Sequence, residues 1–190
     1  MLKKIISLCL IVFLSACLGG YSPDSSFYRL PLIAKPAQTF NAKKSVSVSK
    51  VGLPEYLDRP QMVIIDENSP KIEIAEFHRW GEDLSNMIQR KIASDLSQYL
   101  PLSKIADSKE EVQKANLDIK VEILRLDMIK QGKVILEARW YIYDYQGQII
   151  KKGQFMQEQK IKPNHSEYAA ATSDLLSEMD LKIAQAISEI

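Results

Sequence analysis

Side chains that could act as a nucleophile, a general base or a metal ligand are few in this chain. No GxSxG, P-loop, GxGxxG or HExxH pattern occurs, and the two histidines, His78 and His165, lie far apart in the sequence. Two histidines could meet in space around a metal, but both lie at predicted loop-to-helix junctions, where we expect them to be solvated. Asp58 and Asp127 could form a carboxylate pair, although any acidic chain offers such pairs. We therefore predict no catalytic or metal site and expect that the protein is not an enzyme.

One cysteine has a chemistry of its own. A basic start and the short apolar run 5–14 lead into Leu-Ser-Ala-Cys, which ends at Cys17. This tetrapeptide resembles the lipobox of bacterial lipoproteins. The resemblance implies cleavage between Ala16 and Cys17, a diacylglycerol on the Cys17 thiol and an acyl chain on the new amino terminus, with no other cofactor. The alternative is an ordinary secretory signal followed by a chance cysteine.

Processing at this point would divide the chain into three parts. Residues 1–16 would be the cleaved signal peptide, residues 17–26 the lipidated cysteine with a short tether, and residues 27–190 a single α+β periplasmic domain. Removal of 16 of the 190 residues leaves 174, enough for one domain with a sizeable core. Leu18 follows the cysteine, whereas Asp at that place tends to retain enterobacterial lipoproteins at the inner membrane, so we expect an outer-membrane location.

The composition of the mature chain excludes several kinds of site. Cys9 would leave with the signal and Cys17 would carry lipid, so neither a disulfide nor a thiol nucleophile would remain. The signal also contains two of the 25 basic residues, which leaves 23 against 24 acidic residues. A chain this close to neutrality has no overall attraction to nucleic acid or to anionic lipid.

Periodic apolar patterns predict the secondary structure. The first helix is expected over residues 80–100, with Trp80 at its head, Asp95 on its polar face and Pro101 at its end. A second helix should follow Pro163, with Asn164 or Ser166 as N-cap. Alternation predicts strands over 45–49, 62–65, 71–74, 117–128, 134–142 and 148–160. A shift in the apolar phase at Leu124 indicates either a bulge or a strand that is buried on both faces.

Turn residues then indicate how these strands connect. Residues 66–70 would close a hairpin, and Gln131-Gly132 and Gln146-Gly147 would join the last three strands into an antiparallel meander. The predicted fold is α+β: a mostly antiparallel β-sheet with two long helices packed on one face.

The stretch 53–60, LPEYLDRP, is bracketed by two prolines that stiffen the chain and remove backbone donors. It would form a rigid loop that leads into the strand 62–65. In one interpretation Tyr56 and Leu57 pack near Trp80, and an Asp58–Arg59 pair fixes the loop. In the other, Tyr56, Leu57, Asp58, Arg59, Pro60 and Trp80 contact a partner protein directly.

The same stretch carries a family resemblance. Residues 51–65, VGLPEYLDRPQMVII, followed by the Trp80-Gly81-Glu82-Asp83-Leu84 segment, resemble the ABC-type transport auxiliary lipoproteins. Tyr28-Arg29-Leu30 soon after the lipobox matches a further motif of that family, whereas Ile64-Ile65 departs from the polar or basic residue often found there. The resemblance covers the lipobox and residues 27–100 well, and the C-terminal half only in its pattern of strands and helices.

The resemblance implies a non-catalytic role in lipid transport between membranes. The partner would be an MCE-domain protein of an inner-membrane lipid transporter, and this protein would be its outer-membrane docking component. Self-association into a homo-oligomeric ring would match a multimeric conduit, although the sequence does not show it. Two other hypotheses stay open: an assembly or plug lipoprotein of another envelope machine, such as lipopolysaccharide export, and an envelope hydrolase.

Overall fold

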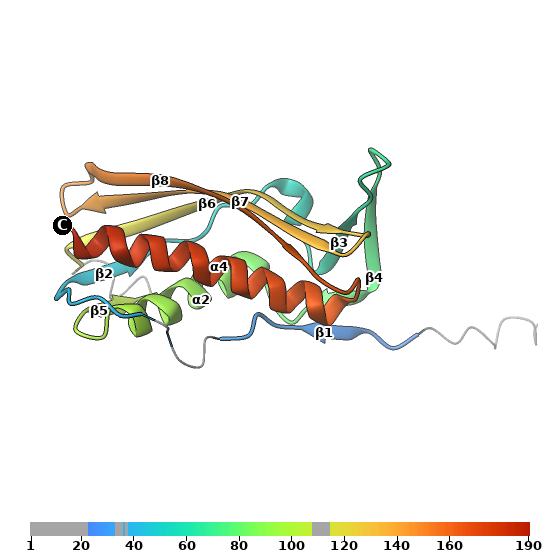
Figure 1. Cartoon of the computed structure of the whole chain (residues 1–190), viewed down its shortest axis with the longest axis horizontal. Coiled ribbons are helices and arrows are strands. Elements are labelled where there is room, and N and C mark those ends of the chain that lie inside the picture. The colour runs from blue at the N-terminus through green and yellow to red at the C-terminus, as the bar shows by residue number, and fades with distance from the viewer. Residues whose placement is uncertain (1–22, 33–35, 37, 108–114) are drawn as a thin grey trace, which may run out of the picture.

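The computed structural model describes residues 23–32, 36, 38–107 and 115–190. The predicted signal peptide, the cleavage site at Ala16 and the lipidation site at Cys17 lie outside the described residues. In the described part, eight strands form one sheet and two long helices cover one of its faces (Figure 1). This arrangement confirms the predicted α+β class.

The C-terminal half contains the predicted antiparallel meander. It consists of β6 (Leu117–Ile129), β7 (Lys133–Asp144) and β8 (Ile149–Lys160). The connecting turns contain Gly132 at φ 89° and Gly147 at φ 78°, a left-handed conformation that glycine adopts without a Cβ clash. The register of β6 against β7 shifts between Ile123 and Arg125, which confirms the predicted bulge.

The predicted hairpin is present, but its second strand is longer than expected. It pairs β3 (Gln61–Ile65) with β4 (Ile72–Trp80). Trp80 therefore ends a strand and does not begin a helix, and His78 lies within the strand and not at a loop-to-helix junction. Both placements correct the sequence prediction. The register of β4 against β3 shifts between Gln61 and Met62. This irregularity interrupts the alternation of side chains along β4, so the sequence pattern did not reveal the second half of the strand.

The short pairings of the sheet are parallel, which the sequence did not predict. The strand β1 (Ser26–Tyr28) pairs with the end of β4, and β2 (Ser45–Val48) lies between β5 (Lys104–Ala106) and the start of β6. The strand β3 pairs in parallel with the end of β6. The sheet is therefore mixed, with antiparallel long pairings and parallel short ones. Parallel neighbours are joined by long crossovers and not by tight turns, so no local turn signature predicts them.

Both helices begin at side-chain caps. The helix α2 (Leu84–Tyr99) starts four residues later than predicted, because the Asp83 carboxylate accepts the Asn86 N–H at 2.9 Å and ends the preceding loop there. The helix α4 (His165–Ser188) is capped by Asn164, whose side-chain oxygen accepts the Glu167 N–H at 2.9 Å. Asn164 is thus the correct choice of the two predicted caps.

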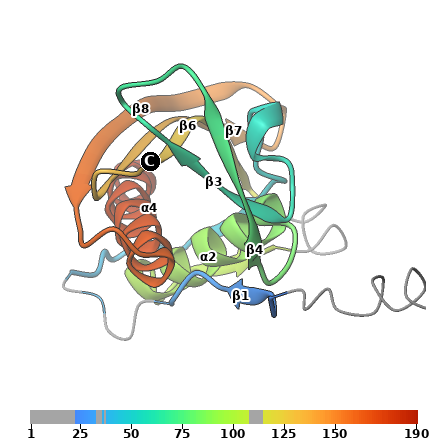
Figure 2. The same cartoon turned by 90° about the vertical axis from the view of Figure 1, so that its right-hand side faces the viewer.

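The core lies between the sheet and the helices. The helix α4 packs on β7 and β8, while α2 packs on α4, β2 and β5. In Figure 2 the sheet curves around α4, so this helix is covered on several sides. The apolar stripe of α2 is buried as predicted, but Asp95 is also fully buried, which corrects its expected place on the polar face.

Candidate partner-binding surface

Residues 45–65 follow one edge of β6 along almost its whole length. The strand β2 pairs with the start of β6, Gly52 forms a bridge to Glu122, and β3 pairs with the end of β6. The Gly52 N–H donates to the Val121 carbonyl at 3.0 Å, and the Gly52 carbonyl accepts the Ile123 N–H at 2.9 Å. The loop 53–60 therefore lies beside the bulged part of β6, at the one stretch of this edge where neither β2 nor β3 is paired.

Tyr56 fixes the loop to the bulge. It lies in the short 3₁₀ helix η1 (Glu55–Leu57), and its hydroxyl donates to Asp127 Oδ1 at 3.1 Å. The same hydroxyl accepts the Leu126 N–H at 3.4 Å, a donor that a neighbouring strand would otherwise satisfy. Arg125 Nε bonds the second carboxylate oxygen of Asp127. Burial, together with the Asp127 carboxylate, raises the pKa of Tyr56 to about 12, so this hydroxyl is protonated throughout the physiological range.

Leu57 and Trp80 belong to the core behind the loop. Leu57 is 4% exposed and Trp80 is 3% exposed. The Trp80 N–H donates to the Pro60 carbonyl at 2.7 Å and so ties the end of β4 to the end of the loop. Neither side chain is accessible on the folded surface, so any effect of these two residues on a partner would act through the position of the loop.

The accessible part of the loop is polar. Glu55, Asp58 and Pro60 are exposed, and Arg59 is half-buried. Among the described residues no ion pair joins Asp58 to Arg59, and the buried Arg59 Nε has no hydrogen-bond partner. The Asp58–Arg59 pair of the first interpretation is therefore absent in the described part. A contact with a partner stays a prediction, and its accessible members are Asp58 and Pro60, with the half-buried Tyr56 and Arg59.

The two histidines do meet, contrary to the expectation that each would be solvated separately. The rings of His78 on β4 and His165 on α4 are stacked, with centroids 3.5 Å apart and an angle of 6° between their planes. In two parallel rings that are in contact, the nitrogen lone pairs lie in parallel planes. They therefore do not point toward a common position at which a metal could bind. In the described ranges no group of three or more histidine, cysteine or carboxylate side chains is arranged to hold a metal.

A buried polar cluster between the helices also escaped the sequence analysis. Lys91 Nζ donates to Asp95 Oδ2 at 2.5 Å and to Ser177 Oγ at 2.7 Å, and both charged side chains are almost completely buried. Asp180 lies beside this pair, and neither of its carboxylate oxygens accepts a hydrogen bond from a described donor. Burial and the neighbouring Asp95 carboxylate raise the pKa of Asp180 well above its ordinary value.

The spacing of two residues in the sequence could have predicted part of this cluster. Lys91 and Asp95 are four residues apart on α2, the spacing of an ion pair on one helix face. That face also carries Ile88 and Ile92, so the pair had to be buried with them. Nothing in the spacing, however, identified Ser177 and Asp180 on α4 as the side chains that would meet it.

Comparison with known protein families identifies the chain. The family model described as ABC-type transport auxiliary lipoprotein component matches residues 28–184, which begin at the last residue of β1 and include the loop 53–60 and most of α4. The chain belongs to this family. A comparison with curated proteins found no match. Membership makes the protein a lipoprotein component of a transport system, and it confirms the resemblance that the loop and the lipobox suggested.

Two solved structures show the same fold. A crystal structure described only as that of an uncharacterized protein aligns with a TM-score of 0.68 at 21% identity and covers 88% of this chain and 98% of that one. A protein of the DUF330 family from Xanthomonas campestris aligns with a TM-score of 0.70 at 11% identity and covers 87% and 97%. Within the described ranges, no helix of this auxiliary lipoprotein has the length and hydropathy that crossing a bilayer would need.

Proposed function

We propose that this auxiliary lipoprotein is the outer-membrane docking component of an MCE-type phospholipid transport system and has no catalytic role. Its membership of the ABC-type transport auxiliary lipoproteins carries the proposal. The lipobox that ends at Cys17 supports lipid attachment, and Leu18 after it favours the outer membrane. The partner would be the MCE-domain protein of an inner-membrane transporter.

The proposed mechanism is tethering. Acyl chains on Cys17 would hold the protein at the periplasmic surface of the outer membrane. Ten tether residues at about 3.3 Å each reach only some 30 Å, so the domain would stay close to its membrane. The loop 53–60 is held rigidly by Tyr56 and by the Trp80–Pro60 hydrogen bond, so it would dock with little loss of conformational entropy.

A crosslinked pull-down from envelopes tests this proposal. The lipidated protein is captured after crosslinking, and its partners are identified by mass spectrometry. Charge reversal at the accessible loop residues, Asp58→Lys and Arg59→Glu, is expected to reduce recovery of the MCE-domain protein at least tenfold. Glu178→Lys, an exposed change on α4, is the matched control and should leave recovery unchanged.

The outcomes separate the function from the contact surface. Recovery of the MCE-domain protein by every variant would support the function and move the contact away from the loop. Recovery of an outer-membrane barrel protein without an MCE-domain protein would overturn the proposal in favour of an assembly or plug role, such as in lipopolysaccharide export. Recovery of no transport component would also overturn it.

A further inference from the structure

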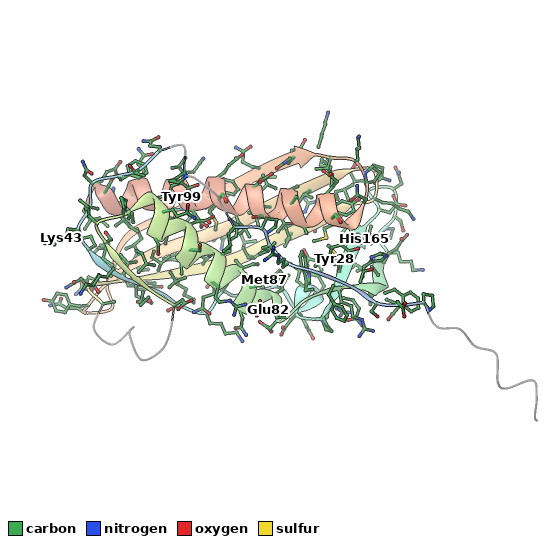
Figure 3. The ribbon with its side chains drawn as sticks, turned by 90° about the horizontal axis from the view of Figure 1, so that it is seen from below. Tyr28, Lys43, Glu82, Met87, Tyr99 and His165 are labelled. Atoms are coloured by element: carbon green, nitrogen blue, oxygen red, sulfur yellow. The ribbon has the colours of Figure 1, made fainter. Side chains whose placement is uncertain are left out.

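The N-terminal strand β1 is attached to the domain by a small number of contacts. Its three residues pair only with the end of β4, and the Gly81 N–H donates to the Tyr28 carbonyl at 2.7 Å. Beyond the strand, the Leu30 N–H contacts the Met87 sulfur at 3.2 Å, and Ser173 Oγ bonds the Pro31 carbonyl. Figure 3 shows Tyr28 and His165 near one another at the end of the molecule where β1 enters.

An aromatic cluster joins β1, β4 and α4 at this end. The Tyr28 hydroxyl is 2.8 Å from Nδ1 of His78, whose ring stacks on that of His165. The Tyr28 ring centroid is 5.9 Å from the His165 centroid, and Tyr168 meets His165 edge-on at 6.3 Å. The stacked histidines therefore lie where the start of α4 meets β4, beside the Tyr28 side chain of β1.

The stacked pair of imidazole rings can include one imidazolium without electrostatic repulsion, but not two. A single imidazolium over a neutral ring is a favourable cation–π arrangement. Two imidazolium rings with centroids 3.5 Å apart would place like charges face to face in a partly desolvated position. His165 also lies in the first turn of α4, where the helix dipole disfavours a cation. Burial and the neighbouring His78 both lower the pKa of His165.

The surrounding charges do not compensate for a second proton. The histidines line one end of a groove of about 410 Å³ between β4 and the start of α4, whose charged lining residues are Glu73, Glu76 and Lys130. Glu73 is paired with Lys130 at 2.9 Å. Glu76 and, in the first turn of α4, Glu167 are exposed to solvent, which screens their charges. The two tyrosines of the cluster are uncharged at acidic pH.

We propose that the stacked His78–His165 pair is an acid-sensitive latch that holds β1 against the domain when at most one ring is protonated and releases it when both are. Release would free residues 26–29 from the domain surface, because Leu30 is 4% exposed and belongs to the core. The three residues 27–29, which the tether of residues 17–26 does not include, would lengthen it by some 10 Å at about 3.3 Å each, about a third of its reach. Only this consequence for the tether depends on the proposed lipid anchor, because the latch itself is a property of the folded domain.

A distance measurement between spin labels tests the latch in the full-length protein. Labels at Ser25→Cys, just before β1, and at Glu178→Cys, on α4, are compared at pH 7.5 and pH 4.5 by double electron–electron resonance. We expect a single narrow distance population at pH 7.5 and loss of most of it, in favour of a broad distribution, at pH 4.5. His78→Gln and His165→Gln each leave one titrating ring, so each variant should keep the narrow population at both values of pH.

A second label pair controls for general unfolding. Labels at Lys152→Cys on β8 and Glu178→Cys on α4 should report the same distance at both values of pH. An unchanged Ser25–Glu178 distance in the unsubstituted protein at pH 4.5 would overturn the proposal. An equally broad Ser25–Glu178 distance distribution at pH 4.5 in both glutamine variants would also overturn it. So would a broader Lys152–Glu178 distribution at the same pH, since either result would mean acid unfolding that is independent of the stack.

Discussion

The Tyr56 hydroxyl bonds a carboxylate and a backbone N–H at the bulge of β6, so its removal leaves both without their partner. Loss of such a hydrogen bond in a half-buried place costs about 1 to 2 kcal/mol. We therefore expect Tyr56→Phe to lower the free energy of unfolding by that amount in urea denaturation. Tyr145→Phe, at a side chain that is 77% exposed, is the matched control and should change it by less than about 0.5 kcal/mol. Equal effects of the two substitutions would contradict the role assigned to Tyr56.

Asp180 couples folding to pH, because the fold raises its pKa well above the ordinary value of 3.8. The folded chain then binds the Asp180 proton more tightly than the unfolded chain does. This difference stabilises the fold fully at pH values below 3.8. This advantage is lost as the pH rises from 3.8 toward the raised pKa, by about 1.4 kcal/mol for each unit of the shift. Asp180→Asn keeps the shape of the side chain and removes the titrating group. The free energy of unfolding of this variant should therefore fall less steeply over this pH range than that of the unsubstituted protein.

Urea denaturation at a series of pH values between 4 and 8 measures this difference. Asp174→Asn, at an exposed position on the same helix, should retain the slope of the unsubstituted protein. Stability profiles for Asp180→Asn and the unsubstituted protein that run parallel would show that Asp180 does not hold its proton in the fold.

At the scale of elements, the segments with a strong local pattern were predicted and those defined by distant partners were not. Tight turns with Gly132 and Gly147 indicated the meander, and the 3–4 spacing of apolar residues indicated both helices. The parallel pairings of β1, β2 and β5 depend on segments far away in the sequence, so no local pattern contains them. The loop 53–60 was correctly predicted to lead into β3, but its attachment to the bulge of β6 required the structure.

Glycine at position 153 determines how closely β7 and β8 pack at Trp140. A Cβ added to Gly153 would lie 2.3 Å from the Trp140 ring, so the indole lies directly over the backbone of β8. Gly153→Ala should displace the ring and cost about 1 to 3 kcal/mol in the free energy of unfolding. Gly52→Ala is the matched control, because its Cβ would meet its nearest neighbour at an ordinary 3.6 Å. A Gly153→Ala variant as stable as the Gly52→Ala variant would contradict this account.

At the scale of the whole molecule, the lipid attachment proposed at Cys17 determines where the domain is found. We expect Cys17→Ala to move the protein from the membrane pellet to the soluble envelope fraction, and to abolish labelling with a clickable fatty acid. Cys9→Ala, within the predicted signal segment, should leave both unchanged. Membrane retention of an unlabelled Cys17→Ala protein would argue against acylation as the anchor.

The central position of β6 has a consequence for how the chain folds. Besides their pairings with β5 and β4, the strands β2 and β3 both pair with β6, and Ser47 Oγ donates to the Leu117 carbonyl across 70 residues of sequence. The contact order of the N-terminal half is therefore high, and high contact order slows folding. A chain that emerges from a translocation channel with its N-terminus first would leave the edges of β2 and β3 that face β6 unpaired until β6 arrives, and its core uncovered until α4 follows. The topology would thus delay completion of the fold until α4 has emerged.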